Sequence, residues 1–259
     1  MADFLDVLGQ KARKRVKEGY YKVTKQIIAP TKSLKEAVLE CKNAPIISEI
    51  KVASPTMGVI RKKIDVNKAA IAMEKGGAIG ISVLTEPKHF KGSIDTFIKV
   101  RSQVDLPLLM KDIVVNRTQI EAAAKMGANA ILLIEALFKR GYCDCDVHRM
   151  IAEAHSQKLE VLLEILTEEE FISAIKTEAD LIGINNRDLR TLEVDLEVTR
   201  RILTKNCFNE KLIVSESGIK SSADVRFLHE CGAHAFLVGS SIMRSSNIQK
   251  MVKELVLAL

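Results

Sequence analysis

Short apolar runs rich in Ile, Leu and Val recur along the chain from residue 45 onward, separated by more polar stretches. Most of these runs are almost continuously hydrophobic, which is typical of strands in a parallel sheet covered on both faces. The sequence therefore predicts eight strands, at 45–50, 79–84, 107–110, 130–134, 160–165, 181–185, 211–215 and 235–239.

The stretches between these runs carry apolar residues three and four positions apart, the spacing of an amphipathic helix. They predict helices at 66–75, 93–102, 116–126, 146–157, 168–176, 195–204, 221–231 and 247–258. Two more helices precede the first strand, at 3–18 and around 32–41. The first of these has an apolar stripe made of Phe4, Leu5, Leu8, Ala12 and Val16. Its basic residues are expected on the other faces: Lys11, Arg13, Arg15 and Lys17.

Three segments repeat one junction between a helix and a strand: "EKGGAIGISVLT", "AKMGANAILLI" and "HECGAHAFLVG". Each has a helix end, a Gly, an Ala and then a strand, and Gly allows the left-handed conformation that ends a helix. Repeated units of this kind predict parallel strands joined by crossovers. Eight predicted strands with intervening helices favour a (β/α)8 TIM barrel of the α/β class. An open doubly wound sheet is the alternative, although no G-x-G-x-x-G follows an early strand.

Composition narrows the class of protein. No linker rich in Pro, Gly or Ser divides the 259 residues, so a single domain over residues 1–259 is the simplest organisation. The formal net charge is +6, but much of the excess lies in "KARKRVKEGYYKVTK", and only 4% of residues are aromatic. Nucleic-acid binding is therefore the weakest interpretation, because an anionic small substrate explains the charge equally well.

No run of about 18 apolar residues predicts a membrane span. The segment "MADFLDVLGQKARKRV" places its basic residues after the apolar ones, unlike a secretory signal, so we expect a cytoplasmic protein. Five cysteines, an odd number, do not suggest a disulfide framework. Cys143, Cys145 and His148 could suggest a metal, but incidental thiols are the simpler interpretation, because structural zinc sites normally supply four ligands.

Polar side chains gather where the predicted strands end. In a barrel, the carboxyl ends of the strands share one rim, and ligands bind there. The opposite ends carry mostly small connector residues, such as Gly77-Ala78 and Gly232-Ala233. This asymmetry predicts a functional site at the carboxyl rim. The rim residues, in strand order, are Glu49, Lys51 and Ser54; Ser82, Thr85 and Glu86; Lys111 and Asp112; Glu135; Glu164; Asn185, Asn186, Arg187 and Asp188; Glu216, Ser217 and Gly218; and Gly239, Ser240 and Ser241.

Three of these rim residues are informative one by one. Glu49 and Lys51 share a face of the first strand, so they either form a structural ion pair or meet a polar ligand. Glu164 lies inside the apolar run "VLLEIL". A carboxylate in such surroundings must find a partner or shift its pKa.

The last two strands suggest a phosphate site. Ser217-Gly218 and Gly239-Ser240 offer hydroxyls and accessible backbone N–H groups, and "GSSIMR" resembles a short helix start. Loops after the seventh and eighth strands, together with such a helix, form the recurrent phosphate site of barrels. Ser54 follows the first strand, which neighbours the eighth in a closed barrel, so it could reach the same phosphate.

At this point the chain resembles the indole-3-glycerol-phosphate synthase family. The resemblance covers nearly the whole chain and rests on "SEIKVASPTMGVI", "SVLTEPKHFKGS", "PLLMKDIVV", "LLEI", "LIGINNRDLRTLEVD", "VSESGI" and "AFLVGSSIMR", in this order. It implies conversion of 1-(2-carboxyphenylamino)-1-deoxyribulose 5-phosphate to indole-3-glycerol phosphate, with loss of carbon dioxide and water and without cofactor or metal. It also implies that residues 1–43 are an N-terminal helical extension that covers the barrel mouth.

The resemblance also assigns roles. It implies catalytic roles for Lys111, Glu164 and Lys51. Lys111 can protonate the ketone oxygen during ring closure. Lys51 either lies near the departing carboxylate or shares the acid role, and Glu164 can shuttle protons in the dehydration. The implied substrate-binding residues are Glu49, Ser54, Phe90, Asn185, Arg187, Glu216 and Ser217, with Phe90 against the aromatic ring. The implied phosphate-binding residues are Ser54, Gly218, Gly239 and Ser240.

Two positions depart from the family pattern. Ile113 stands where the family usually has Phe, which removes one aromatic wall, and Glu135 stands where an apolar residue is expected. Two other functions stay open: a different phosphate-handling barrel such as phosphoribosylanthranilate isomerase, which needs a cysteine that no strand end here supplies, and a phosphate-binding barrel without catalysis. The expected partner is a small phosphorylated substrate, with no nucleic acid and no membrane, and we expect a monomer.

Overall fold

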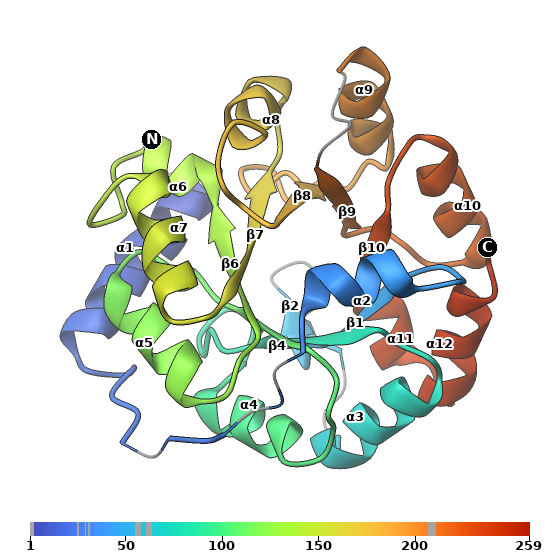
Figure 1. Cartoon of the computed structure of the whole chain (residues 1–259), viewed down its shortest axis with the longest axis horizontal. Helices are drawn as coiled ribbons and strands as arrows, with labels where there is room; N and C mark the ends of the chain where they lie inside the picture. Colours follow the sequence, from blue (N-terminus) through green and yellow to red (C-terminus); the bar gives the residue numbers. More distant parts are fainter. Residues whose placement is uncertain are drawn as a thin grey trace.

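Eight parallel strands close into a barrel in the order β1-β10-β9-β8-β7-β6-β5-β4 (Figure 1). The computed structural model describes residues 3–24, 26–28, 30, 32–54, 58–60, 64–206 and 211–259, and of Ser54 only the backbone. Closure is direct, because β1 pairs with both β10 and β4. The predicted TIM barrel is therefore confirmed, and the open sheet is excluded. The barrel strands are β1 (Ile46–Ile50), β4 (Gly80–Leu84), β5 (Leu108–Lys111), β6 (Ala130–Ile134), β7 (Glu160–Ile165), β8 (Leu181–Asn185), β9 (Leu212–Glu216) and β10 (Ala235–Val238).

Helices surround the barrel, and most lie within two residues of their predicted bounds. They are α3 (Val66–Lys75), α4 (Ile94–Arg101), α5 (Arg117–Lys125), α7 (Val147–Ser156), α8 (Glu168–Ala174), α9 (Glu197–Lys205), α10 (Ser222–Glu230) and α12 (Ile248–Val256). Two short helices, α6 (Glu135–Lys139) and α11 (Ser240–Arg244), follow β6 and β10 directly. The antiparallel pair β2 (Ala53–Ser54) and β3 (Gly58–Val59) was not predicted, because two-residue strands carry no periodic pattern.

The apolar residues form two layers because successive strand residues point to opposite faces. Ile46 belongs to the layer between strands and helices, whereas Ile47 belongs to the layer inside the barrel, and both are fully buried. Each such side chain stabilises the fold by about 1.5–3 kcal/mol. The inner layer fills the interior of the barrel below the carboxyl ends of its strands, with residues such as Leu109, Leu162 and Val214. It leaves the carboxyl ends of the strands to polar groups.

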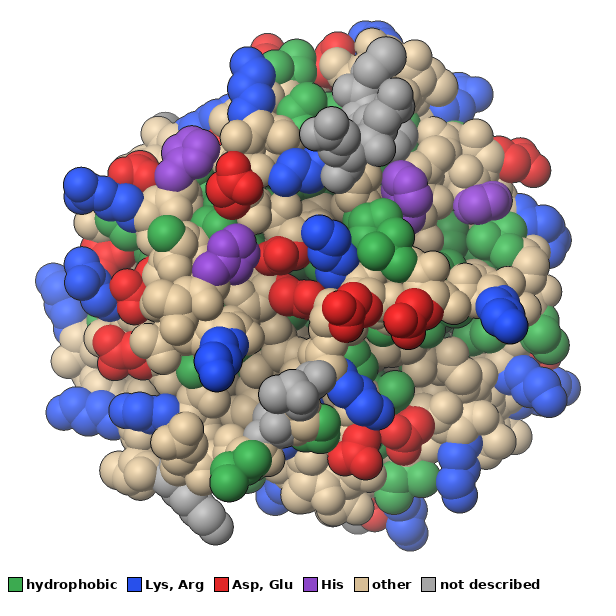
Figure 2. Space-filling view, viewed as in Figure 1, with side chains coloured by type: hydrophobic (Ala, Val, Ile, Leu, Met, Phe, Trp, Pro, Cys, Tyr) green, Lys and Arg blue, Asp and Glu red, His purple; other side chains and the backbone are tan. Residues whose placement is uncertain are grey.

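The two helices of the N-terminal extension lie at opposite ends of the barrel. In α1 (Phe4–Lys17), Phe4 and Leu8 line the cavity at the carboxyl ends of the strands. In α2 (Leu34–Glu40), the backbone N–H of Leu34 donates to Glu160 at the start of β7, and Leu34 itself is fully buried. Helix α2 thus covers the amino-terminal end of the barrel, with acidic side chains on its outward side (Figure 2). Among the described residues of 1–43, therefore, α1 lies at the mouth and α2 at the opposite end.

The expectation that Arg15 faces solvent with the other basic residues of α1 is wrong. Arg15 is only 4% exposed, and it continues the buried face of Leu8 and Ala12 at helical spacing. The helical pattern predicts this arginine on a solvent-facing side, because Arg is almost never fully buried unless it is paired. Here the partners come from segments far away in the sequence.

Candidate active site

A cavity of about 780 Å³ opens at the carboxyl ends of the barrel strands. All eight strands contribute to its lining, which explains why polar residues recur at every strand end. The cavity brings together twelve of the thirteen predicted site residues: Glu49, Lys51, Phe90, Lys111, Glu164, Asn185, Arg187, Glu216, Ser217, Gly218, Gly239 and Ser240. The side chain of the thirteenth, Ser54, lies outside the described residues.

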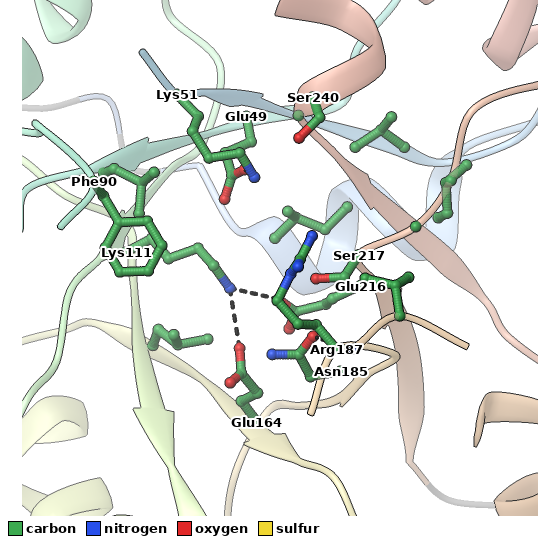
Figure 3. A pocket seen from close by; sticks show the side chains of 18 of the residues that line it. Glu49, Lys51, Phe90, Lys111, Glu164, Asn185, Arg187, Glu216, Ser217 and Ser240 are labelled. Carbon is green, nitrogen blue, oxygen red and sulfur yellow. Dashed lines mark hydrogen bonds and ion pairs between the residues drawn. The ribbon is translucent and has the colours of Figure 1, made fainter. Parts of the chain in front are cut away.

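Lys111 is the centre of an ion cluster in this cavity (Figure 3). Its ammonium Nζ, at the end of β5, donates to Glu164 Oε2 on β7 at 3.2 Å and to Glu216 Oε2 on β9 at 2.5 Å. The carboxylates are almost completely buried, and the Lys111 side chain is 15% exposed. The barrel therefore holds the ammonium in one place and presents it to the cavity.

Burial and charge act in opposite directions on these groups. Burial by itself lowers the pKa of Lys111, but Glu216, Glu164 and Glu49 raise it well above its usual value. Burial raises the pKa of Glu216 to about 7, against the effect of Lys111 and with the added repulsion of Glu164. Lys111 is therefore a charged proton donor at neutral pH, and Glu216 can take up a proton close to neutrality.

The raised pKa of Glu216 predicts how stability depends on pH. In the folded protein Glu216 titrates at about 7 instead of 4.5, so the folded state binds an extra proton between these values and loses stability as the pH rises through them. Glu216→Gln should lack this loss. Relative to wild type, we expect its free energy of unfolding to be about 1–3 kcal/mol larger at pH 8 than at pH 5, so the variant is relatively more stable at the higher pH. Urea unfolding at both pH values measures this, and a difference that does not change with pH would contradict it.

The sequence left open whether Glu49 and Lys51 form an ion pair or face a ligand site, and the structure shows both an ion pair and a place in the cavity lining. Lys51 Nζ pairs with Glu49 Oε2, and both residues line the cavity. Although burial raises the pKa of Glu49, Lys51 and Lys111 hold it below its usual value. The pair is thus a charged wall of the cavity, opposite Glu164 (Figure 3).

Two glycines make room for these carboxylates. A Cβ on Gly239 would overlap Glu49 Oε2, and a Cβ on Gly183 would overlap Glu216 Oε1. Sequence reasoning assigned Gly239 to phosphate binding only and did not single out Gly183. The required space depends on the side chain of the neighbouring strand, which a single-strand pattern does not reveal.

The loop after β8 is ordered by its own polar residues. Asn185 Oδ1 accepts a hydrogen bond from the backbone N–H of Arg187 at 3.0 Å, and the Arg187 guanidinium donates to the carbonyl of Leu192 at 2.8 Å. Burial lowers the pKa of Arg187, and Glu49 opposes this effect. Asn186, in contrast, is not part of the cavity lining; its amide N–H donates to Ser215 Oγ, and its Oδ1 accepts from Thr199 Oγ1. Of the two neighbouring asparagines, only Asn185 reaches the site.

One end of the cavity suits a phosphate. Ser217 and Gly218 both have positive φ, 68° and 88°, and they form a tight turn directly after β9. Gly239 and Ser240 line the same cavity after the neighbouring strand β10, at the start of α11. Lys220 and Arg244 also line this end and were not predicted; the signal available in "GSSIMR" was the arginine that follows its hydroxyl residues.

The other end of the cavity is apolar and suits an aromatic ring. Phe90 lies there, on the side of Lys111 that is remote from Ser217 and Ser240 (Figure 3). Ile113, the departure from the family pattern, is part of this wall and is 5% exposed. The other apolar residues of this end are Phe4, Leu8, Leu84, Leu132, Ile134 and Leu189, which sequence reasoning did not assign to the site. The apolar stripe of the first helix was the available signal for Phe4 and Leu8.

Of the other rim residues, Glu86, Asp112 and Ser241 also line this cavity, whereas Ser82, Thr85, Glu135, Asn186 and Asp188 lie outside its lining. Glu135, the second departure, begins α6 and accepts a hydrogen bond from Ser173 at 2.8 Å. Within the described ranges, no three His, Cys, Asp or Glu side chains are grouped so that they could hold a metal ion, and this includes Cys143, Cys145 and His148. Among the same residues, no helix is both long and apolar enough to cross a membrane.

Comparison with known proteins gives a consistent result. A family model described as indole-3-glycerol phosphate synthase matches residues 6–255. The chain is 42% identical over 232 residues to the indole-3-glycerol phosphate synthase of Methanocaldococcus jannaschii, covering 88% of this chain and 82% of the relative. It is 41% identical over 214 residues to that of Caldanaerobacter subterraneus subsp. tengcongensis, covering 81% of this chain and 80% of the relative.

Solved structures add support for the fold alone. A thiamine phosphate pyrophosphorylase from Pyrococcus furiosus has a TM-score of 0.59 at 19% identity, covering 84% of this chain and 95% of its own. The N-acetylmannosamine-6-phosphate 2-epimerase from Clostridium perfringens has a TM-score of 0.60 at 16% identity, covering 82% and 92%. At such identities the likeness concerns the barrel and not its chemistry.

Proposed function

The chain belongs to the indole-3-glycerol phosphate synthase family, and on this premise we propose how its cavity carries out the reaction. As a carboxy-lyase of tryptophan biosynthesis it acts on a phosphorylated substrate. We assign that substrate as 1-(2-carboxyphenylamino)-1-deoxyribulose 5-phosphate. Its phosphate would lie against Ser217, Gly218, Gly239 and Ser240, and its aromatic ring against Phe90 and Ile113. The ketone would then lie between these ends, close to Lys111.

Ring closure joins the aromatic carbon that carries the carboxylate to the ketone carbon. This aromatic carbon is a weak nucleophile, so the ketone oxygen must receive a proton as the bond forms. Lys111 is suited to donate it, because its two carboxylate partners keep it charged and fixed within the cavity. Binding at both ends also folds the flexible substrate onto itself, which lowers the entropic part of the barrier.

The later steps release carbon dioxide and then water. Breaking the bond to the carboxylate restores the electron pair to the ring system, and Lys51, paired with Glu49, offers a positive charge beside the departing group. Dehydration requires a proton for the leaving hydroxyl and removal of a proton from the neighbouring carbon, which is bonded to the nitrogen. We assign this exchange to Glu164, which is buried and hydrogen bonded to the ammonium of Lys111.

One observation carries this proposal: the Lys111 ammonium contacts Glu164 and Glu216 inside a cavity that has a phosphate cradle at one end and an apolar wall at the other. The alternative of an isomerase finds no cysteine among the residues that line this cavity. A cytoplasmic location and a monomeric state are the further parts of the proposal, and membership in a family of biosynthetic enzymes favours the first of them.

The direct test mixes the protein with the carboxyphenylamino substrate and follows indole fluorescence and carbon dioxide together. The chain contains no Trp, so its own emission does not interfere. We expect both products to form in equal amounts. The matched control is the substrate reduced at the ketone, which can bind at both ends but cannot close the ring. Tight binding of the true substrate without either product would instead favour a phosphate-binding barrel without catalysis.

A further inference from the structure

Arg15 of α1 is buried among carboxylates that belong to two different barrel segments. Its guanidinium NH1 donates to Glu86 Oε1 at 2.9 Å, and its NH2 lies 3.5 Å from Asp112 Oδ1. Glu86 follows β4 and Asp112 follows β5, and both are at most 2% exposed. A buried arginine is stable only when such partners compensate for its lost hydration. One side chain of the N-terminal extension therefore joins two segments of the barrel rim.

Neutral groups complete this buried cluster. Arg15 Nε donates to Tyr21 Oη at 3.3 Å. Tyr21 Oη in turn donates to Asp112 Oδ2 at 3.1 Å. Thr85 Oγ1 donates to the same carboxylate oxygen at 2.6 Å. The cluster of Arg15, Tyr21, Thr85, Glu86 and Asp112 thus links α1 and the turn after it to the segments that follow β4 and β5 by direct hydrogen bonds.

Both carboxylates of the cluster also shape the backbone of the ring-binding wall. The second oxygen of Glu86 accepts the backbone N–H groups of His89 at 2.6 Å and Phe90 at 3.0 Å. Asp112 accepts the backbone N–H of Ile113 at 2.7 Å and directly follows Lys111 in the chain. The groups that hold Arg15 are therefore the groups that set the position of Phe90, of Ile113 and of the backbone at Lys111.

We propose that Arg15 is a positioning residue that fixes the apolar, ring-binding end of the cavity through Glu86 and Asp112. This inference rests on the proposed function, since it takes that end of the cavity as the site of the aromatic ring. Without the guanidinium, two buried carboxylates face each other without a cation, and the segments that carry Phe90 and Ile113 move apart or take up protons. The phosphate end, built on β9 and β10, has no part in the cluster.

The test compares two probes that occupy opposite ends of the cavity. Indole-3-glycerol phosphate reports on the whole site through its indole fluorescence, and inorganic phosphate, measured by calorimetry, reports on the phosphate end alone. For Arg15→Met we expect the Kd of indole-3-glycerol phosphate to rise roughly tenfold or more. The Kd of inorganic phosphate should change by less than about twofold, because the phosphate end shares no residue with the cluster around Arg15. Arg15→Lys, which keeps the charge but not the fork, should be intermediate.

Arg13→Met is the matched control. Arg13 also anchors α1, because it donates to the carbonyls of Gly141 and Tyr142 at 2.6 Å each. These partners do not belong to the cluster around Arg15. It should leave both Kd values within about twofold of wild type, because exposed contacts contribute little. If Arg13→Met weakened the indole probe as much as Arg15→Met, docking of α1 alone would explain the effect and the inference would be wrong. Equal weakening of both probes by Arg15→Met would overturn it as well.

Glu86→Gln keeps the test valid if Arg15→Met does not fold. It retains an oxygen for the backbone N–H groups of His89 and Phe90 while it removes the charge that holds Arg15. We expect it to weaken the indole probe selectively, and unchanged binding would refute the inference. Neither probe depends on turnover, so the two proposals fail separately. If the wild-type protein makes product and Arg15→Met binds both probes as tightly as wild type, the inference about Arg15 is wrong and the proposed function stands.

Discussion

Replacing Lys111 by alanine is expected to lower kcat by roughly 10³- to 10⁴-fold. The reason is the weak nucleophile: without a proton donor at the ketone oxygen, ring closure would have to form an unstabilised alkoxide. Lys111 is held for this role by Glu164 and Glu216 and keeps its proton at neutral pH. Single-turnover measurements of indole fluorescence at saturating substrate test this, because they separate the chemical step from binding.

Lys111→Arg separates charge from proton donation. Arginine retains the positive charge between the two carboxylates but does not release its proton at accessible pH. We therefore expect it to bind substrate better than Lys111→Ala and yet to be almost as slow. Lys51→Ala is the comparison that decides which lysine is the dominant acid. A larger loss in Lys51→Ala than in Lys111→Ala would reverse the roles proposed for the two residues.

The Lys111→Ala barrel should remain folded despite the loss of a buried cation. Removing one partner of a buried pair normally costs about 3–5 kcal/mol, because the remaining charge is uncompensated. Here Glu216, whose pKa is already raised to about 7 by burial, can take up a proton and remove that charge. Far-UV circular dichroism and urea unfolding should therefore show a native fold with reduced stability, and the loss of activity can then be assigned to chemistry.

The barrel was predictable from the sequence because its signals are local. Strand bounds follow from apolar runs, helix ends from Gly and caps, and the polar rim from the position of each residue within its own run. Glu164 illustrates this, since a carboxylate inside "VLLEIL" indicates a polar partner without naming it. The partner, Lys111, is 53 residues away in the chain. Only the closed barrel brings the two together.

What was missed depends on such distant contacts. The burial of Arg15 could not be foreseen, because Glu86 and Asp112 lie 71 and 97 positions further along the chain. The helix pattern alone gave an arginine on an amphipathic helix, for which solvent exposure is the usual outcome. In the same way, Gly183 became informative only when Glu216 was seen beside it. Residues whose role is to leave space or to hold another residue give little signal in their own segment.

The cavity also shows how one barrel separates binding from chemistry. The cluster around Lys111 uses strands β5, β7 and β9, whereas the phosphate cradle uses the residues after β9 and β10. The ring-binding wall comes from α1, from β4 and β6, and from the segments after β4, β5 and β8. Because these parts belong to different segments, a substitution in one part should change the affinity for the end of the substrate that it binds and should leave the affinity of the other parts nearly unchanged. Separate probes can therefore be assigned to separate ends of the substrate.

The second large effect is expected for Glu164→Gln, which should lower kcat by about 10²- to 10³-fold with little change in KM. Glutamine has nearly the same shape and can still accept the hydrogen bond from Lys111, but it cannot exchange a proton. If Glu164 acts in the dehydration, the variant should close the ring and release carbon dioxide in a first turnover, without the indole fluorescence that marks loss of water. Rapid-quench measurement of both signals tests this order.

Glu216→Gln is the matched control at the other carboxylate partner of Lys111, and it should not separate the two signals. Equal slowing of carbon dioxide release and fluorescence from the first turnover of Glu164→Gln would instead place Glu164 at or before ring closure, since a residue needed only for dehydration cannot delay the step that precedes it.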